Sequence, residues 1–97
     1  MTRKKIFELI ADNRNMIKNF GVKRLGIFGS RAKGTSHAKS DVDVLVEFKN
    51  TSFDNYMDLK FFLESLFKTK VDLVMNSTLK PALRSIILKQ VKYAKEL

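Results

Sequence analysis

The amino-acid sequence predicts an α/β (α+β) domain in which a small mixed β-sheet carries helices packed on it. Stretches with apolar residues at helical spacing alternate with short runs of β-branched residues, in the order helix, strand, loop, strand, helix, strand, helix. The chain has 97 residues, of which 44% are hydrophobic, and this share is enough for one modest core. We therefore expect a single domain over residues 1–97.

The first third of the chain predicts a helix followed by a strand. Apolar side chains recur every three or four positions over residues 2–20, which is the spacing of one helical face. Gly21 follows, where a left-handed helix end costs least. Residues 22–28 are rich in β-formers and predict a strand that stops at Gly29.

The middle of the chain predicts a loop, a second strand and a second helix. Residues 31–40 are polar and predict a helical turn and a loop. Apolar side chains alternate along residues 42–48, which is the period of a strand. Ser52 suits the N-cap of a helix over residues 54–68, whose apolar side chains form a second stripe.

The last third predicts a strand over residues 70–75 and a closing helix, for which Pro81 suits the first turn. Met57 and Phe61 lie opposite the stripe of the preceding helix, so either the closing helix covers them or they form an exposed apolar patch. The face that we expect the closing helix to bury consists of Leu83, Ile86, Ile87, Val91 and Ala94.

Composition excludes several classes of protein. The chain has no Cys and one His, which excludes a disulfide framework, a thiolate zinc site and a His-based triad. No apolar run reaches the roughly 18 residues of a membrane span and no signal peptide opens the chain, so we expect a cytoplasmic protein without membrane contact. The net charge of +9 indicates a polyanionic ligand, an acidic partner or a preference for solubility.

Three carboxylates interrupt the apolar strands. Asp41 and Asp43 lie two positions apart, so both side chains project from one face. Adjacent carboxylates repel and cost desolvation, a penalty that a divalent cation such as Mg²⁺ removes. Asp72 repeats the anomaly on the third strand, and three carboxylates can hold two metal ions for phosphoryl or nucleotidyl transfer. Taken singly, the Asp-x-Asp pair is also typical of a solvated strand edge, and Asp72 of a strand end.

A second feature is the turn at Gly29-Ser30, where the first strand stops. Glycine allows a ligand to approach the backbone, whose N–H groups can cradle phosphate. Arg31 and Lys33 add positive charge nearby, although an isolated Gly-Ser pair is usually only a turn. His37 lies in the same loop, where a solvated residue is expected more than a nucleotide contact.

Gly29-Ser30, followed after ten residues by Asp41-Val42-Asp43, resembles the signature of the nucleotidyltransferase superfamily that includes DNA polymerase β. The chain looks most like the minimal nucleotidyltransferases of that superfamily. This resemblance implies the nucleotidyltransferase fold and the transfer of AMP from ATP, with Mg²⁺ as cofactor (two ions) and pyrophosphate as leaving group. The matching segments are residues 29–34, 40–43, 71–74 and 79–81.

The resemblance also implies roles for individual residues. Gly29 and Ser30 match the pair that binds the triphosphate. Asp41 and Asp43 match the two shared metal ligands. Asp72 matches the third carboxylate, which holds the catalytic metal and helps to deprotonate the acceptor hydroxyl. Glu47 lies two strand positions beyond Asp43, roughly 6.5–7 Å away, and is not expected in the metal site.

Minimal nucleotidyltransferases usually act as the antitoxin of a prokaryotic, type VII-like toxin–antitoxin module, in which AMP is transferred onto a tyrosine of a HEPN-domain toxin. The resemblance therefore implies a HEPN toxin as partner and makes nucleic acid an unlikely substrate. Because the chain is little more than a catalytic core, we expect the partner or a second copy to supply the acceptor surface.

Three functions stay open from the residues alone: an AMP-transferring enzyme, an antitoxin that acts by occlusion, and a basic nucleic-acid-binding protein. The intact set of carboxylates favours the enzyme. Four cations are predicted beside the apolar face of the closing helix, where they form either a solvated face or a docking surface for an acidic partner or RNA. They are Lys80, Arg84, Lys92 and Lys95.

Overall fold

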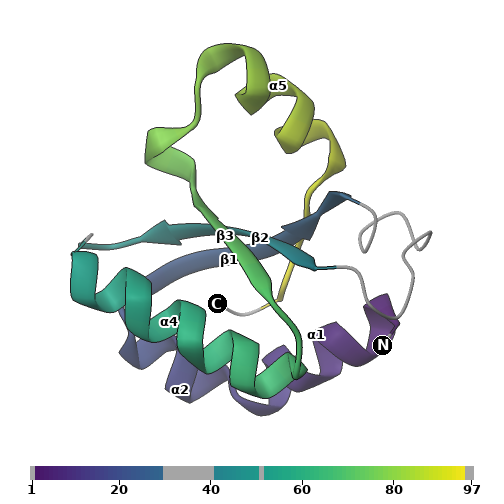
Figure 1. The fold of residues 1–97 in the computed structure, drawn as a ribbon, viewed down its shortest axis with the longest axis vertical. Helices are drawn as coiled ribbons and strands as arrows, with labels where there is room; N and C mark the ends of the chain where they lie inside the picture. The colour runs from purple at the N-terminus through teal and green to yellow at the C-terminus, as the bar shows by residue number, and fades with distance from the viewer. Residues whose placement is uncertain (1, 30–40, 51, 96–97) are drawn as a thin grey trace.

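A mixed sheet of four strands, in the order β3-β2-β1-β4, forms the centre of the molecule (Figure 1). Strands β1 (Val22–Phe28) and β2 (Val42–Phe48) are antiparallel. Strand β3 (Val71–Met75) pairs with β2 in parallel, and the short strand β4 (Lys92–Tyr93) pairs with β1 antiparallel. The sheet and its helices confirm the predicted fold class.

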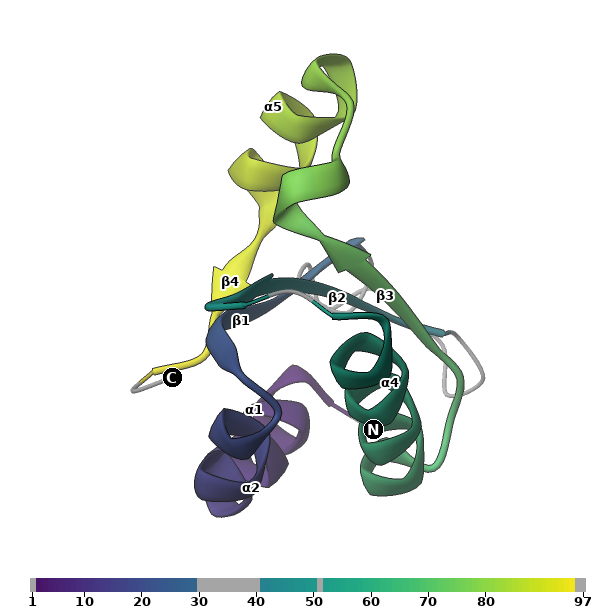
Figure 2. The same ribbon diagram turned by 90° about the vertical axis from the view of Figure 1, so that its left-hand side faces the viewer.

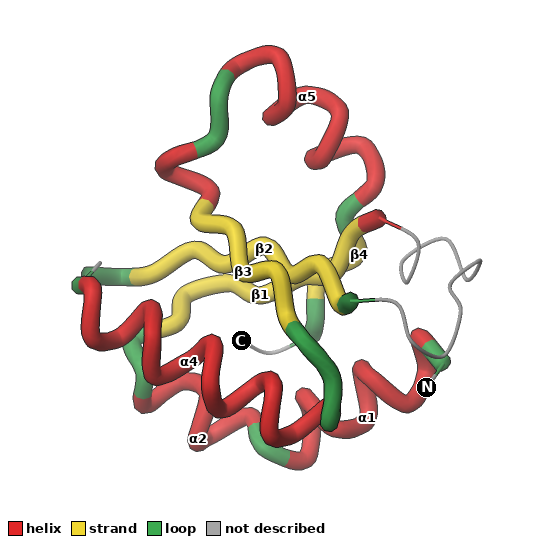
Figure 3. Tube along the Cα trace, in the orientation of Figure 1, coloured by secondary structure: helices red, strands yellow, loops and turns green. Residues whose placement is uncertain are grey.

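The computed structural model describes residues 2–29, 41–50 and 52–95. Within these ranges no helix is long and apolar enough to cross a membrane. Figure 3 shows the order of helices, strands and loops along the trace.

Helices cover the two faces of the sheet unequally (Figure 2). Helices α1 (Arg3–Asp12), α2 (Arg14–Asn19) and α4 (Phe53–Phe67) lie together on one face. Helix α5 (Pro81–Gln90) follows the short 3-10 helix η1 (Asn76–Thr78) and stands on the opposite side of the sheet.

The core fills the space between the sheet and helices α1, α2 and α4. Alternation along β2 directs Val42, Val44 and Val46 into this core, so Asp43 and Glu47 belong to the other face of the sheet. We call this other face the open face, because α5 is the only α-helix in the described ranges that stands over it. The buried core residues are Ile6, Ile10, Ile17, Val22, Leu25, Ile27, Val42, Val44, Val46, Leu59, Leu63, Phe67, Val71 and Leu73.

The prediction of one helix over residues 2–20 was wrong, because Asn13 divides it into α1 and α2. Asn13 donates from its side-chain Nδ2 to the carbonyl of Leu9 at 2.8 Å. Such side-chain bonds to the backbone compete with the helical pattern. The predicted helix ends are confirmed elsewhere: Gly21 is left-handed, with φ +85°, and the Ser52 hydroxyl accepts a hydrogen bond from the Asn55 amide at 3.1 Å.

The predicted continuation of the closing helix through Val91 and Ala94 was also wrong. Helix α5 ends at Gln90, and the chain then adds strand β4 to the edge of β1. Gly26 makes this approach possible, since a Cβ there would lie 2.7 Å from Val91 Cγ2 and 3.0 Å from the Lys92 carbonyl oxygen.

Two further contacts fasten β4. The Ala94 amide donates to the Leu25 carbonyl at 2.8 Å. The Arg24 guanidinium lies 3.8 Å from the centre of the Tyr93 ring, a cation–π contact. Lys92 therefore lies on a strand and Lys95 just after it. The prediction that both belong to the closing helix was wrong.

Helix α5 does not bury its apolar face, contrary to the prediction. None of its residues is buried, and Leu83 and Ile86 are 51% and 53% exposed. Because the turn after β3 leads the chain to the open face, α5 cannot cover α4 on the other side. Phe61 of α4 accordingly stays 58% exposed, and Met57 is half-buried.

Candidate active site

The parallel pairing of β2 and β3 brings two of the predicted site carboxylates side by side. Asp43 and Asp72 are register partners, and so are Val42 and Val71 one residue earlier. The Val42 amide donates to the carbonyl of Lys70 at 3.0 Å, which fixes this register at the start of both strands. Neighbouring strands are about 4.8 Å apart, so the two carboxyl groups start from adjacent backbones on the open face.

Gly29 lies on the other flank of Asp43. Phe28 is the register partner of Asp43 across the antiparallel β1–β2 pair, and Gly29 is the next residue. Its φ of +71° is in the left-handed region, which favours glycine. A Cβ on Gly29 would also collide with Asp43 Oδ2 and lie 3.3 Å from Asp43 Cγ. The backbone conformation favours glycine here, and a side chain at this position would displace the Asp43 carboxylate, which lies directly against this turn.

The electrostatics of the site centre on Asp43. Its side chain is half-buried, whereas Asp41 and Asp72 are exposed. Burial raises the pKa of the Asp43 carboxyl above its ordinary value of 3.8, and the negative charges of Asp72 and Asp41 raise it further. The three carboxylates are thus electrostatic neighbours, as the sequence analysis expected. A group whose charged form is disfavoured in this way gains from a nearby cation.

The carboxylates do not converge into a ready-made metal cluster. Among residues 2–29, 41–50 and 52–95, no three acidic, His or Cys side chains come together closely enough to hold a metal ion. Like charges repel, so carboxylates have no reason to converge by themselves. The donor set nevertheless fits a hard divalent cation, which takes carboxylate oxygens together with phosphate oxygens of a substrate.

Contacts from α4 hold both flanks of Asp72, and no pattern in the sequence indicates them. The Val71 amide donates to Glu64 Oε2 at 3.0 Å, and the Tyr56 hydroxyl donates to the Leu73 carbonyl at 2.6 Å. From the sequence, Tyr56 belongs only to the apolar stripe of the helix predicted over residues 54–68. These two bonds fasten the edge strand β3 at the residues on either side of Asp72.

Other residues from the sequence analysis lie away from these carboxylates or outside the described part of the chain. Glu47, which was not expected at the metal site, faces Lys23 with Oε1 to Nζ 3.7 Å apart. Ser30, Arg31, Lys33 and His37 lie outside the described residues. The roles predicted for Ser30, Arg31 and Lys33 near the triphosphate stay predictions, as does the expectation of a solvated His37.

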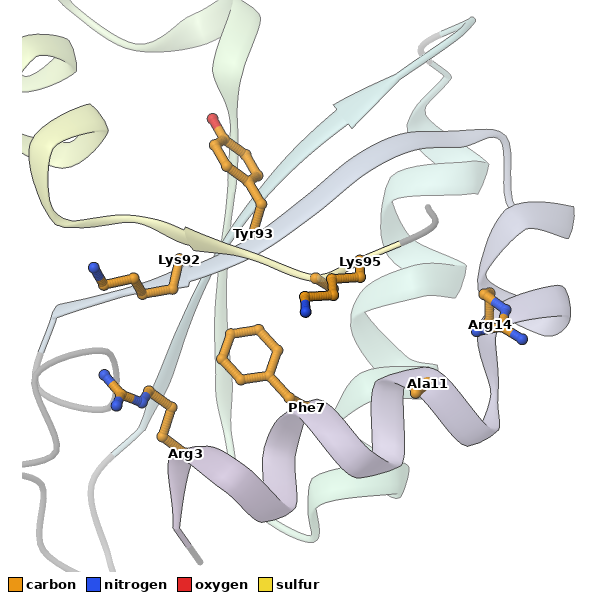
Figure 4. A pocket seen from close by; sticks show the side chains of 8 residues that line it. Arg3, Phe7, Ala11, Arg14, Lys92, Tyr93 and Lys95 are labelled. Atoms are coloured by element: carbon orange, nitrogen blue, oxygen red, sulfur yellow. The ribbon is translucent and has the colours of Figure 1, made fainter.

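A separate hollow of about 710 Å³ lies between α1 and the C-terminal strand (Figure 4). Phe7 points into it from α1, and cationic side chains stand around it. None of the predicted site carboxylates belongs to its lining. The lining consists of Arg3, Phe7, Ala11, Arg14, Lys92, Tyr93, Ala94 and Lys95.

Comparison with known proteins identifies the family. The model of the nucleotidyltransferase domain matches residues 9–94. The chain belongs to this family. It is similar to the protein adenylyltransferase MntA of Thermococcus cleftensis, with 38% identity over 86 residues, which are 88% of this chain and 87% of MntA.

Solved structures agree with this assignment. A minimal nucleotidyltransferase superposes on this chain with a TM-score of 0.83 at 29% identity, covering 95% of both chains. A toxin–antitoxin crystal structure with AMP-PNP superposes with a TM-score of 0.69 at 26% identity, covering 97% of this chain and 73% of the other. This nucleotidyltransferase therefore combines the minimal form of the fold with the Gly29, Asp43 and Asp72 arrangement described above.

Proposed function

We propose that this nucleotidyltransferase moves AMP from ATP onto a tyrosine hydroxyl of a HEPN-domain toxin, with Mg²⁺ as cofactor, and so acts as the antitoxin of a type VII-like module. This proposal rests on the strand register that places Asp72 beside Asp43, and on the contact between the Asp43 carboxylate and the Gly29 turn. The likeness to the protein adenylyltransferase MntA and to a toxin–antitoxin structure with AMP-PNP supports the choice of nucleotide and partner.

The reaction joins the acceptor oxygen to the α-phosphorus of ATP. The bond from that phosphorus to the oxygen bridging to the β-phosphorus breaks, and pyrophosphate leaves with the bonding electrons. The acceptor hydroxyl loses its proton. This displacement needs a held triphosphate, charge neutralisation and a proton acceptor.

Each need corresponds to a residue of the site. The left-handed turn at Gly29 exposes backbone to the triphosphate, and Ser30 follows with a hydroxyl. Asp41, Asp43 and Asp72 would hold Mg²⁺, which when bound supplies the positive charge that the phosphates need. Asp72 is exposed on the open face, so its carboxylate can accept the proton of a hydroxyl that a partner presents.

The variant Asp72→Asn tests the proposal. It should bind ATP and the partner, because Asp41 and Asp43 remain, but it should leave the mass of the partner unshifted and its toxicity intact. Asp58→Asn is the matched control, since Asp58 is an exposed carboxylate on α4, on the opposite face of the sheet. Intact-mass spectrometry of the product of the adjacent gene, the proposed HEPN-domain partner, incubated with Mg-ATP, measures the transfer.

The same experiment separates catalysis from occlusion. If Asp72→Asn still protects cells without adding the mass of AMP to the partner, binding alone neutralises the toxin. If it adds AMP at the rate of the unchanged protein, the assignment of Asp72 to the chemistry is wrong.

A further inference from the structure

Helix α5 carries apolar side chains that nothing in the described part of the chain buries. Eight of its ten residues are exposed, and only Ile87 and Gln90 are half-buried. Leu83 and Ile86, which lie one turn apart, are each about half exposed. A helix of ten residues is marginal in water without packing. This face is therefore suited to be covered by another molecule.

The charge around α5 indicates the chemistry of that molecule. Between Asp72 and Glu96 the chain has no acidic residue. The same stretch contains five cations, of which Lys80, Arg84 and Lys89 lie on α5 or directly before it. A surface that combines apolar and cationic side chains complements a segment that combines apolar and acidic ones.

The position of α5 connects this surface to the proposed reaction. α5 stands over the open face of the sheet (Figures 1 and 2), the face to which Asp43 and Asp72 belong. A molecule bound to α5 is thereby held on the side of the sheet where the reaction takes place. The apolar residues of α4 lie on the opposite side and lack this connection.

We propose that α5 and the residue before it, residues 80–90, form the docking surface for an acidic, partly apolar segment of the partner protein. The inference rests on the proposed function for the identity of the partner and adds where that partner binds. The exposed aliphatic side chains argue for a protein segment. Single-stranded nucleic acid is bound by aromatic stacking, and α5 contains no aromatic residue.

Two pairs of variants test the docking surface. The first compares Leu83→Ser/Ile86→Ser on α5 with Phe53→Ser/Phe61→Ser on α4. Phe53 and Phe61 are at least as exposed, at 76% and 58%, so neither pair removes core packing. We expect the α5 pair to weaken binding of the HEPN protein at least tenfold in a calorimetric titration without ATP. The α4 pair should stay within twofold of the unchanged protein.

The second comparison changes charge. Lys80→Glu/Lys89→Glu on the α5 surface should weaken the same binding at least tenfold and reduce its dependence on salt. Lys4→Glu/Lys5→Glu changes the net charge equally, on exposed residues of α1 across the sheet, and should leave binding within twofold. Circular dichroism checks that all four variants are folded.

The outcomes separate this inference from the proposed function. Binding that depends on α5, without added AMP on the partner, would support the docking surface and overturn the proposed reaction. AMP transfer and binding that survive both α5 variants would overturn the docking surface and leave the reaction standing. Three other outcomes would also overturn the docking surface. The first is loss of binding in the α4 pair, and the second is concentration-dependent self-association through α5. The third is binding of an RNA oligonucleotide or of phosphatidylserine vesicles that depends on α5 while the affinity for the partner stays unchanged.

Discussion

Replacing Gly29 with Ala would act on two properties of this glycine, its left-handed backbone and its contact with Asp43. The backbone has φ +71°, where an L-residue with a side chain costs about 1–2 kcal/mol. In a domain of this size each kcal/mol lowers Tm by about 4–8 °C. The added Cβ would also collide with Asp43 Oδ2, so the carboxylate has to move. Since misplacing a reacting group by about 1 Å can cost about 100-fold in rate, we expect AMP transfer to fall by at least that factor.

Gly21 provides a matched control for the backbone alone. It has φ +85°, and a Cβ there would lie 3.4 Å from Asn55 Nδ2, close to an ordinary contact distance. Gly21→Ala should therefore lower the free energy of unfolding by about 1–2 kcal/mol, as at Gly29, and keep its transfer activity. Thermal denaturation measures the first quantity, and intact-mass analysis of the partner measures the second. The reasoning is refuted if Gly29→Ala transfers AMP at the unchanged rate, or if Gly21→Ala loses as much activity as Gly29→Ala.

Single substitutions at Asp43, Tyr56 and Gly26 should each have a measurable effect on stability or local order. Asp43→Asn should raise the Tm of the protein, measured in chelator at neutral pH. Burial and the neighbouring carboxylates raise the pKa of Asp43 in the folded protein. The unchanged protein therefore loses stability as the pH rises through that pKa, whereas the variant does not. A lower Tm of the variant would contradict this. Tyr56→Phe removes the bond to the Leu73 carbonyl and should cost about 1–2 kcal/mol in urea unfolding; a change below about 0.3 kcal/mol would show that water replaces the hydroxyl. Gly26→Val should displace β4, so hydrogen exchange at the Ala94 amide should lose its protection; unchanged protection would mean that β4 tolerates the added side chain.

The sequence by itself determined most of the secondary structure and the spacing of the site. Alternation along residues 42–48 placed Asp43 among buried valines, and the structure confirms that strand with its stated bounds. The structure also confirms the predicted helix end at Gly21 and the predicted N-cap at Ser52. Both could be predicted because helix ends depend on bonds and backbone angles within a few residues. Asn13 shows the limit of this reasoning, since its spacing fits one continuous helix while its side chain bonds to the backbone and ends the first one.

Only the tertiary structure decided which side of the sheet each late element occupies. Leu83 and Ile86 have the spacing of a buried helical face, but the turn after β3 leads α5 over the open face, away from the core. A sequence pattern indicates that one face of a helix is apolar, but it does not indicate which element covers that face. For the same reason β4 was missed, although Gly26 inside a strand is the signal of close backbone approach that could have indicated it.

The candidate site divides in the same way. The residue types and the spacing from Gly29 to Asp43 are local, so the sequence was sufficient to select them. The proximity of Asp72 depends on the parallel pairing of β3 with β2, a contact between residues 29 positions apart in the chain. The bonds from Glu64 and Tyr56 that hold β3 beside Asp43 form only when α4 packs under the sheet. The raised pKa of Asp43 follows from that assembly, because burial and neighbouring charge exist only in the folded protein.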